Sequence, residues 1–218
     1  MRIRRFGEAE KMDKKKGYVV THTHWDREWR YPIWQNRILL VQFFEELFKI
    51  LDSDDDYACF VCDGQSIIIE DYLEVRPCDE EKIKKYIAED RIKIGPWYDL
   101  YPIDGECMVR NLLKGTRYCN SLGGHLQVGY NSFGWGQTAQ FPQIYAGFGV
   151  DFVIAAKHVN KKRAPYSEFL WTAPDGTQVL TSRLGKDARA NFFMNSYIKI
   201  MFDKEYKTPE YNYTYGQN

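Results

Sequence analysis

The chain has 218 residues, of which 44% are hydrophobic and 16% aromatic. This length fits one domain, or part of a larger barrel, and the composition excludes a disordered, collagen-like or coiled-coil chain. Lysine plus arginine number 30, as do aspartate plus glutamate, so the formal net charge is zero. Without a large positive field to hold nucleic acid or an anionic membrane, we expect neither as a partner.

The N-terminal segment 1–16 is basic but has no apolar stretch typical of a secretory signal, so we expect a disordered leader. The chain has no apolar run approaching the 18 residues that would predict a membrane-spanning helix. Five scattered cysteines favour a reducing cytoplasm over a disulfide framework. Cys59 and Cys62 form an isolated C-x-x-C motif within an apparent strand, where they would face opposite sides and so make a poor zinc or redox pair.

From Gly17 onward, short apolar runs typical of strands alternate with helical patterns. In chain order we expect a strand at 18–20, a helix with apolar residues from Leu40 to Leu51, a strand at 57–61, helices at 66–75 and 79–89, a strand at 92–94, a helix at 106–121, a strand at 126–130, a helix at 138–147 and a strand at 150–156. Asp79 is the expected cap of one helix, and Val109, Leu112 and Leu113 the expected buried face of another. The alternation predicts βαβ units and a parallel sheet.

After this alternation, FLWT and TQVLTSRL predict two strands joined by a turn at Pro174, Asp175 and Gly176. The last residues, 207–218, form a polar tail without periodicity. Five strand–helix units are too few to close an eight-stranded barrel, so the chain is either an open sheet or the first part of a longer barrel.

Polar and aromatic residues directly follow several of the expected strands. In parallel α/β folds ligands bind beyond the carboxyl ends of the strands, so these residues should meet at one rim. His24 and Asp26 in HTHWDREW form an H-x-D pair whose side chains point to the same side if the loop is extended. They suit zinc or a similar divalent ion, although two ligands alone do not make a site. Alternatively, the histidine caps the next helix and Asp26 pairs with Arg27 or Arg30.

Other rim residues carry weaker signals. Asp63 is either a turn residue or a substrate contact. Trp29, Trp97 and Trp135 would either stack on sugar faces or pack at the rim.

Taken together, four stretches resemble the α-mannosidases of glycoside hydrolase family 38, especially the bacterial cytoplasmic type. They are HTHWDREW, DGQSIIIEDYLEVRP, IGPWYDLYPIDGECMVRNLL and GYNSFGWGQTAQFPQI. The resemblance covers about residues 17–185. It implies the N-terminal portion of a (β/α) barrel-like catalytic domain, here placed at 17–206 with a late β-hairpin. It also implies one divalent metal, most commonly zinc, and retaining hydrolysis of terminal α-mannosides.

By this resemblance His24 and Asp26 match two metal ligands, and Trp29 matches an aromatic residue near the mannose subsite. We expect Asp63, Trp97 and Tyr98 to line the same sugar pocket. Asn131 stands in an N-S-F-G motif where the family has D-S-F-G, whose aspartate is both a metal ligand and the nucleophile.

Asn131 is the decisive departure from the family, because an amide is uncharged and a very poor nucleophile. The resemblance also places a further metal-binding histidine and the general acid beyond residue 218. We therefore expect a truncated, inactive member that holds zinc weakly and whose exposed barrel surface favours self-association.

Two other functions remain open for this sequence. The first is a non-catalytic sugar-binding pseudoenzyme on the same fold. The second is a metal-dependent carbohydrate deacetylase, although the sequence lacks the H-x-x-x-H pair that would complete its metal set.

Overall fold

The protein has mixed α/β structure, seen in a computed structural model that describes residues 18–100, 104–130, 137–155, 159 and 162–184. The expected leader 1–16 and tail 207–218 lie outside the described residues, as do Asn131 and Trp135. The elements follow in the order β1 (Thr21–His22), α1 (Ile33–Ser53), β2 (Phe60–Val61), α2 (Ile67–Val75), η1 (Pro77–Asp79), α3 (Glu80–Ala88), β3 (Ile92–Lys93), α4 (Gly105–Ser121), β4 (Gly129–Tyr130), α5 (Phe141–Gly147), β5 (Phe152–Ala155), β6 (Glu168–Thr172) and β7 (Gln178–Arg183).

These elements match the expected order, with the largest differences in the strands. The expected strand at 18–20 is wrong: Tyr18, Val19 and Val20 are exposed, and β1 begins at Thr21. β2, β3 and β4 each have only two residues, shorter than the apolar runs that predicted them.

The strands form two separate sheets among the described residues. β1, β2 and β3 pair in parallel in that order, while the second sheet has the order β4-β5-β7-β6. β4, β5 and β7 are parallel, and β6 is antiparallel to β7. The predicted parallel pairing and the predicted hairpin are therefore confirmed, whereas closure into a barrel stays a prediction.

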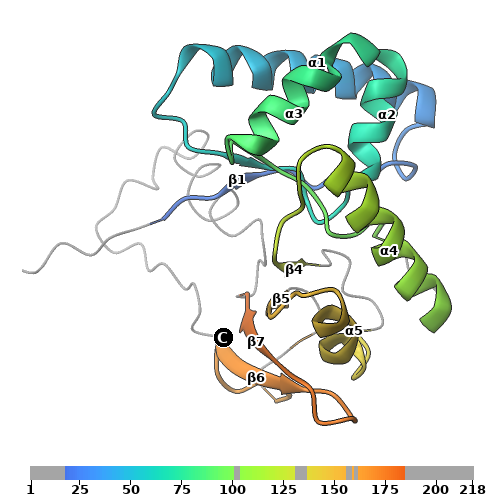
Figure 1. Cartoon of the computed structure of the whole chain (residues 1–218), viewed down its shortest axis with the longest axis vertical. Helices are drawn as coiled ribbons and strands as arrows, with labels where there is room; N and C mark the ends of the chain where they lie inside the picture. The colour runs from blue at the N-terminus through green and yellow to red at the C-terminus, as the bar shows by residue number, and fades with distance from the viewer. Residues whose placement is uncertain (1–17, 101–103, 131–136, 156–158, 160–161, 185–218) are drawn as a thin grey trace, which may run out of the picture.

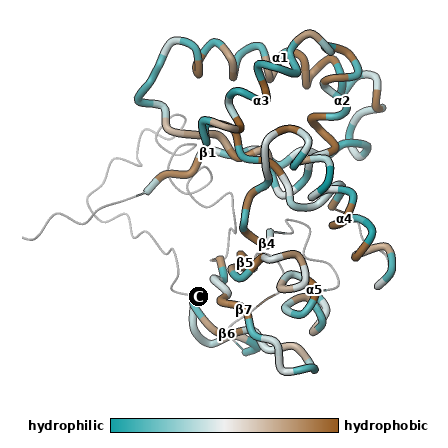
Figure 2. Tube along the Cα trace, in the orientation of Figure 1, coloured by the Kyte–Doolittle hydropathy of each residue, from teal (hydrophilic) through white to brown (hydrophobic). Residues whose placement is uncertain are grey.

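The first sheet is covered by α1, α2 and α3, which lie together on one side of it in Figure 1. The buried face of α1 includes Leu40, Phe44, Leu47 and Leu51, with the i, i+4, i+7, i+11 spacing of an amphipathic helix. Figure 2 shows the resulting alternation of hydrophobic and hydrophilic segments along this helix. This packing buries the apolar side of the helices while leaving the carboxyl ends of the strands to polar loops.

The second sheet has a core of its own, built from α4, α5, β5, β7 and the loop after β3. Its largest member is Trp97, which is fully buried and donates a hydrogen bond from Nε1 to the hydroxyl of Tyr145 at 3.1 Å. Edge contacts to Phe141 and Tyr145 complete the packing of the indole.

α4 buries a different face from the one predicted. Leu112 is buried, but Val109 is 42% exposed and Leu113 is 36% exposed. The buried stripe continues from Leu112 through Gly115 to Cys119. A Cβ on Gly115 would lie 2.3 Å from the carbonyl oxygen of Pro96, so a small residue is required where the helix meets this loop.

Two local predictions have mixed outcomes. Asp79 does occupy the N-cap position of α3, but its carboxylate makes no capping hydrogen bond. It accepts a hydrogen bond from the hydroxyl of Tyr72 at 2.5 Å instead. The turn between β6 and β7 is as predicted: Asp175 accepts a hydrogen bond from the N–H of Thr177, and Gly176 has a φ of 89°.

Two sequence-level features have structural counterparts. None of the helices in the described ranges has the length and hydropathy needed to cross a membrane. All five cysteines are free thiols. Burial raises the pKa of Cys62, which opposes formation of the thiolate that metal binding or redox chemistry needs.

Candidate functional site

The loop after β1 carries the H-x-D pair. Thr23 extends the strand by donating its N–H to the carbonyl of Val61 at 3.2 Å, and the chain then leaves the sheet. The side chains of His24 and Asp26 are 14% and 19% exposed, so both are largely sheltered yet reachable from solvent. The carboxyl end of the parallel sheet therefore presents both groups, as the sequence predicts.

His24 lies between two carboxylates. Nδ1 is 2.8 Å from Oδ2 of Asp63, and Nε2 is 3.0 Å from Oδ1 of Asp26. Asp63 is fully buried, so it stands behind the imidazole and does not line an open surface. The expected contact of Asp63 with substrate stays a prediction, whereas its contact with His24 is observed.

The geometry of His24 and Asp26 fits two ligands of one metal ion. Two ligand atoms at about 2.0–2.2 Å from a shared zinc ion lie about 3.0–3.5 Å apart at the usual angles. The separation between Nε2 and Oδ1 is 3.0 Å. Oδ1 of Asp26 is nevertheless buried without a hydrogen-bond partner among the described residues, because the two groups do not have hydrogen-bond geometry. A buried carboxylate oxygen in this state suits a cation.

The described residues alone do not complete a metal site. Over residues 18–100, 104–130, 137–155, 159 and 162–184, no group of three or more His, Cys, Asp or Glu side chains is arranged to hold a metal ion. The third predicted ligand, Asn131, lies outside these ranges. The His24–Asp26 pair can therefore supply two ligands to a centre that other residues complete.

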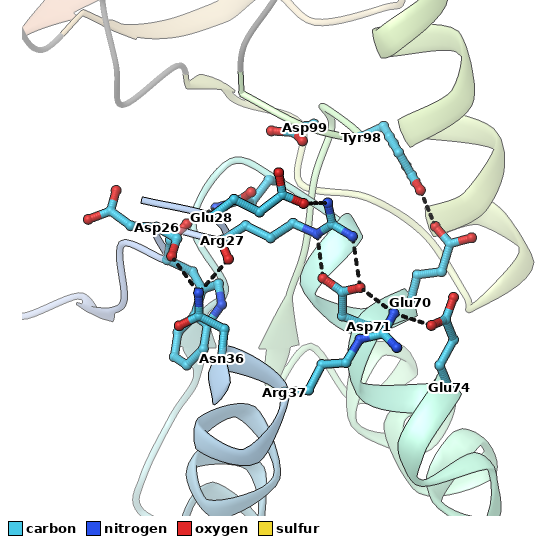
Figure 3. A network of polar contacts seen from close by, with 12 residues as sticks. Asp26, Arg27, Glu28, Asn36, Arg37, Glu70, Asp71, Glu74, Tyr98 and Asp99 are labelled. Carbon is cyan, nitrogen blue, oxygen red and sulfur yellow. Dashed lines mark hydrogen bonds and ion pairs between the residues drawn. The ribbon is translucent and has the colours of Figure 1, made fainter. Parts of the chain in front are cut away.

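Arg27 anchors the loop to α2, as Figure 3 shows. Its Nε donates to Asp71 at 2.5 Å and a terminal nitrogen donates to the second carboxylate oxygen at 3.0 Å, a bidentate pair. Arg37 also donates to Asp71, at 3.1 Å, and pairs with Glu74. The hydrogen bond to Asp71 raises the pKa of Arg27 above its ordinary value.

This network bears on the alternative interpretation of the H-x-D pair. Arg27 pairs with Asp71 and Glu28, not with Asp26. The residue at the N-cap of α1 is Pro32, so His24 is not the helix cap. Among the described residues, His24 therefore does not cap α1 and Arg27 does not pair with Asp26, while the metal-binding role of the H-x-D pair stays a prediction.

Two amides hold the backbone of the same loop. The side-chain nitrogen of Asn36, which is buried in α1, donates to the carbonyls of Asp26 and Arg27 (Figure 3). It also donates to the carbonyl of Tyr31. The side-chain nitrogen of Gln65 donates to the carbonyl of Trp25 at 2.8 Å. These contacts fix the direction of the loop between β1 and α1.

Sequence reasoning missed these anchoring residues. Arg27 and Asp71 are 44 positions apart, and neither carries a local pattern that predicts the pair. Gln65 was the easier one to find, because it sits two residues after Asp63 in the same strand-end loop.

The other predicted sugar contacts lie in different surroundings. Trp97 belongs to the second core and has no open ring face. Tyr98 donates its hydroxyl to Glu70, and the ammonium of Lys114 lies 3.4 Å from the centre of its ring. Trp29 is 62% exposed. Of the predicted aromatic contacts that the structure describes, Trp29 alone combines proximity in sequence to His24 with a ring open to solvent.

Asp99 is a further carboxylate beside this loop and is labelled in Figure 3. Burial raises its pKa, and a hydrogen bond of 2.6 Å from the N–H of Leu100 partly offsets that effect. Arg27 also lowers the pKa of this carboxyl.

The order of these features along the chain matches a known family. The model for the glycosyl hydrolases family 38 N-terminal domain matches residues 14–214. The chain belongs to this family. Its glycoside hydrolase relatives include a putative mannosylglycerate hydrolase of Halalkalibacterium halodurans, 35% identical over 197 residues that cover 84% of this chain and 21% of the relative. An α-mannosidase of Saccharomyces cerevisiae is 24% identical, with 89% of this chain and 18% of the relative covered.

Two solved structures resemble the fold of this chain. An α-mannosidase from Enterococcus faecalis superposes with a TM-score of 0.69 at 29% identity, over 86% of this chain and 22% of that one. A 4-α-glucanotransferase from Thermococcus litoralis gives a TM-score of 0.59 at 11% identity, over 88% of this chain and 31% of that one, which shows likeness of fold alone. The chain spans about a fifth of the length of the family 38 relatives that it matches.

Proposed function

We propose that these residues form the first part of a metal-assisted α-mannoside site in which hydrolysis proceeds with retention of configuration. The observation that supports this most directly is the His24–Asp26 pair at the carboxyl end of β1, with its 3.0 Å separation and its buried carboxylate oxygen. Membership of family 38 and the names of the relatives supply the substrate class.

In this proposal His24 and Asp26 bind a divalent ion, most simply zinc. When bound, such an ion would supply Lewis-acid contacts for sugar hydroxyl groups. Trp29, whose ring is exposed next to the loop, would stack on the mannose face. Arg27, Asn36 and Gln65 keep the loop in position and need not touch the sugar.

Asn131 sets a limit on the chemistry that we propose. At the position that matches the family nucleophile, an amide cannot form the usual glycosyl ester, because it lacks the negative charge and the leaving-group chemistry of a carboxylate. We therefore propose that the chain with Asn131 does not turn over α-mannosides.

The same residue favours a second function, binding of mannose-containing sugars without hydrolysis. A chain that keeps the metal pair and the stacking tryptophan, but not the nucleophile, retains the groups for recognition. Binding and hydrolysis are therefore to be measured separately.

For hydrolysis, residues 17–185 would replace the matching segment of the Enterococcus faecalis α-mannosidase, with Asn131 or with Asn131→Asp. We expect the Asp form to cleave 4-nitrophenyl α-mannoside several orders of magnitude faster, as for the loss of a nucleophile in other covalent mechanisms. Equal rates in the two forms would contradict the assignment of Asn131.

For binding, titration of the 218-residue chain with methyl α-mannoside would be followed by tryptophan fluorescence in the presence of zinc. We expect a response that Trp29→Ala removes, while Trp34→Ala, an equally exposed tryptophan in α1, serves as the control. A response to methyl α-glucoside of the same size would show that the site does not select mannosides.

A further inference from the structure

The turn that carries Asp63 is held rigidly by backbone contacts. Cys62 donates its N–H to the carbonyl of Lys93 at 2.8 Å, and Trp97 donates to the carbonyl of Gly64 at 3.1 Å. Asp63 itself has a φ of 52°, in the left-handed region that aspartate tolerates better than most residues. The backbone therefore fixes the direction of the Cα–Cβ bond of Asp63, and the contacts of its carboxylate fix the rest of the side chain.

The carboxylate of Asp63 points toward His24. Oδ2 of Asp63 lies 2.8 Å from Nδ1 of the imidazole, and the side-chain nitrogen of Gln65 donates to the same oxygen at 3.3 Å. Because the two nitrogens of an imidazole point to opposite sides of a rigid ring, fixing Nδ1 also fixes the direction of Nε2. On that other side stands Asp26.

A second contact connects the same turn to β4. A Cβ on Gly64 would lie 2.2 Å from the carbonyl oxygen of Tyr130, so the turn and the end of β4 approach as closely as two backbones can. Asn131 follows Tyr130 directly in the sequence. Asp63 thus contacts His24, the first predicted ligand, and Gly64 lies against Tyr130, which directly precedes Asn131, the third predicted ligand.

We propose that Asp63 is a positioning residue that accepts a hydrogen bond from Nδ1–H of His24 and thereby turns Nε2 toward the position where Asp26 offers its carboxylate. A carboxylate behind a metal-binding histidine fixes the tautomer and strengthens the ligand, and its loss typically lowers metal affinity about 10–100-fold. The consequence for metal binding rests on the proposed function; the consequence for the ring of His24 does not.

Nuclear magnetic resonance of the 218-residue chain tests the ring directly. In protein labelled with ¹⁵N-histidine, we expect a downfield Nδ1–H signal of His24, assigned by its loss in His24→Gln. Asp63→Gly should abolish this signal, and glycine accepts the left-handed backbone without strain. Asp63→Asn, which keeps an acceptor without the charge, should shift the signal upfield.

The matched control is Asp90→Gly. Asp90 is the other non-glycine residue with positive φ in the described part of the chain, at 61°, and it pairs with Lys93 on the surface. We expect this variant to keep the His24 signal unchanged. Absence of the signal from the folded parent chain, or its persistence in folded Asp63→Gly, would overturn the proposal. Should Asp63→Gly not fold, an unchanged signal in Asp63→Asn would overturn it.

Zinc affinity, measured by competition with a chromogenic chelator, separates this proposal from the proposed function. We expect Asp63→Gly to bind zinc about 10–100-fold more weakly than the parent and Asp90→Gly to bind equally well. If His24→Gln leaves zinc binding unchanged, or the parent binds none, the metal part of the proposed function fails while the ring signal still decides the role of Asp63. If His24→Gln weakens binding and Asp63→Gly does not, the positioning role fails while the function stands.

Discussion

The loop between β1 and α1, which carries His24, and the hairpin of β6 and β7 are held in place by different kinds of bond. In the first sheet each strand has only two paired residues, and this loop is held by side chains such as Arg27, Asn36 and Asp63. In the second sheet, five residues of β6 pair with β7 in a continuous backbone ladder. Side-chain anchoring places chemical groups accurately but depends on a few residues, whereas a ladder tolerates most substitutions.

The largest effect is expected where the two regions meet, at Trp97. Its backbone bonds the turn at Gly64, while its indole fills the second core. Trp97→Ala should lower the free energy of unfolding by about 3–5 kcal/mol, since it leaves a large cavity and removes the bond to Tyr145. Urea unfolding measures this, with exposed Trp34→Ala as the control. A decrease in the free energy of unfolding below about 1 kcal/mol would show that Trp97 does not form a core that supports both regions.

The next largest effect tests the side-chain anchoring itself. Asp71→Ala leaves Arg27 and Arg37 without their shared carboxylate, whose side chain is only 4% exposed. We expect a loss of about 2–3 kcal/mol, less than for a fully buried pair because both arginines keep some contact with water. Glu74→Ala, which removes an exposed partner of Arg37, should cost well under about 1 kcal/mol in the same urea experiment. Equal losses in the two variants would mean that Asp71 is not the centre of the network.

Gly64→Ala tests the close approach between the turn after β2 and the end of β4. The added Cβ would meet a backbone oxygen, so the segments must move apart at a cost of about 1–3 kcal/mol. Gly147→Ala in α5 has open space around the new Cβ and provides the control. Thermal unfolding compares the two, and equal midpoints would contradict the contact with Tyr130.

Asn36→Ala removes three hydrogen bonds to the loop carbonyls while leaving α1 intact. We expect a cost of about 1–2 kcal/mol together with faster amide hydrogen exchange in residues 24–31. Exchange in β6 and β7 should not change, because that hairpin is held by its own ladder. Faster exchange in the loop and in the hairpin would show that the hairpin also depends on Asn36 and is not held by its own backbone pairing alone.

The smallest effect is expected at Asp104, the exposed cap of α4. Its carboxylate accepts from the N–H of Cys107 at 2.8 Å, and this bond holds the pKa of Asp104 below its ordinary value of 3.8. A lowered folded-state pKa stabilises the protein above the unfolded value, and this contribution disappears as the pH falls through the folded value. The small difference between parent and Asp104→Ala in urea should therefore be present at neutral pH and vanish in strong acid. If the stability difference between the parent and Asp104→Ala did not change with pH, the charged cap would not be its cause.

The sequence alone predicted most of the fold, because the relevant signals are local. Apolar spacing from Leu40 to Leu51 was enough to identify α1, and the Pro174–Gly176 turn was enough to identify the hairpin. The position of His24 and Asp26 followed from their place directly after a strand. Strand lengths and the buried face of α4 were predicted less well, since Gly115 packs there on a loop that local periodicity does not reveal.

Tertiary structure alone decided which rim residues touch one another. Asp63 and Trp97 both follow strands and both suit a sugar site by residue type, yet one stands behind His24 and the other fills a core. Arg27 and Asp71 have no local signal because their bond depends on how α2 packs beside the loop. Local periodicity reports which side of an element is buried, whereas partners far apart in sequence are chosen by the packing of whole elements against each other.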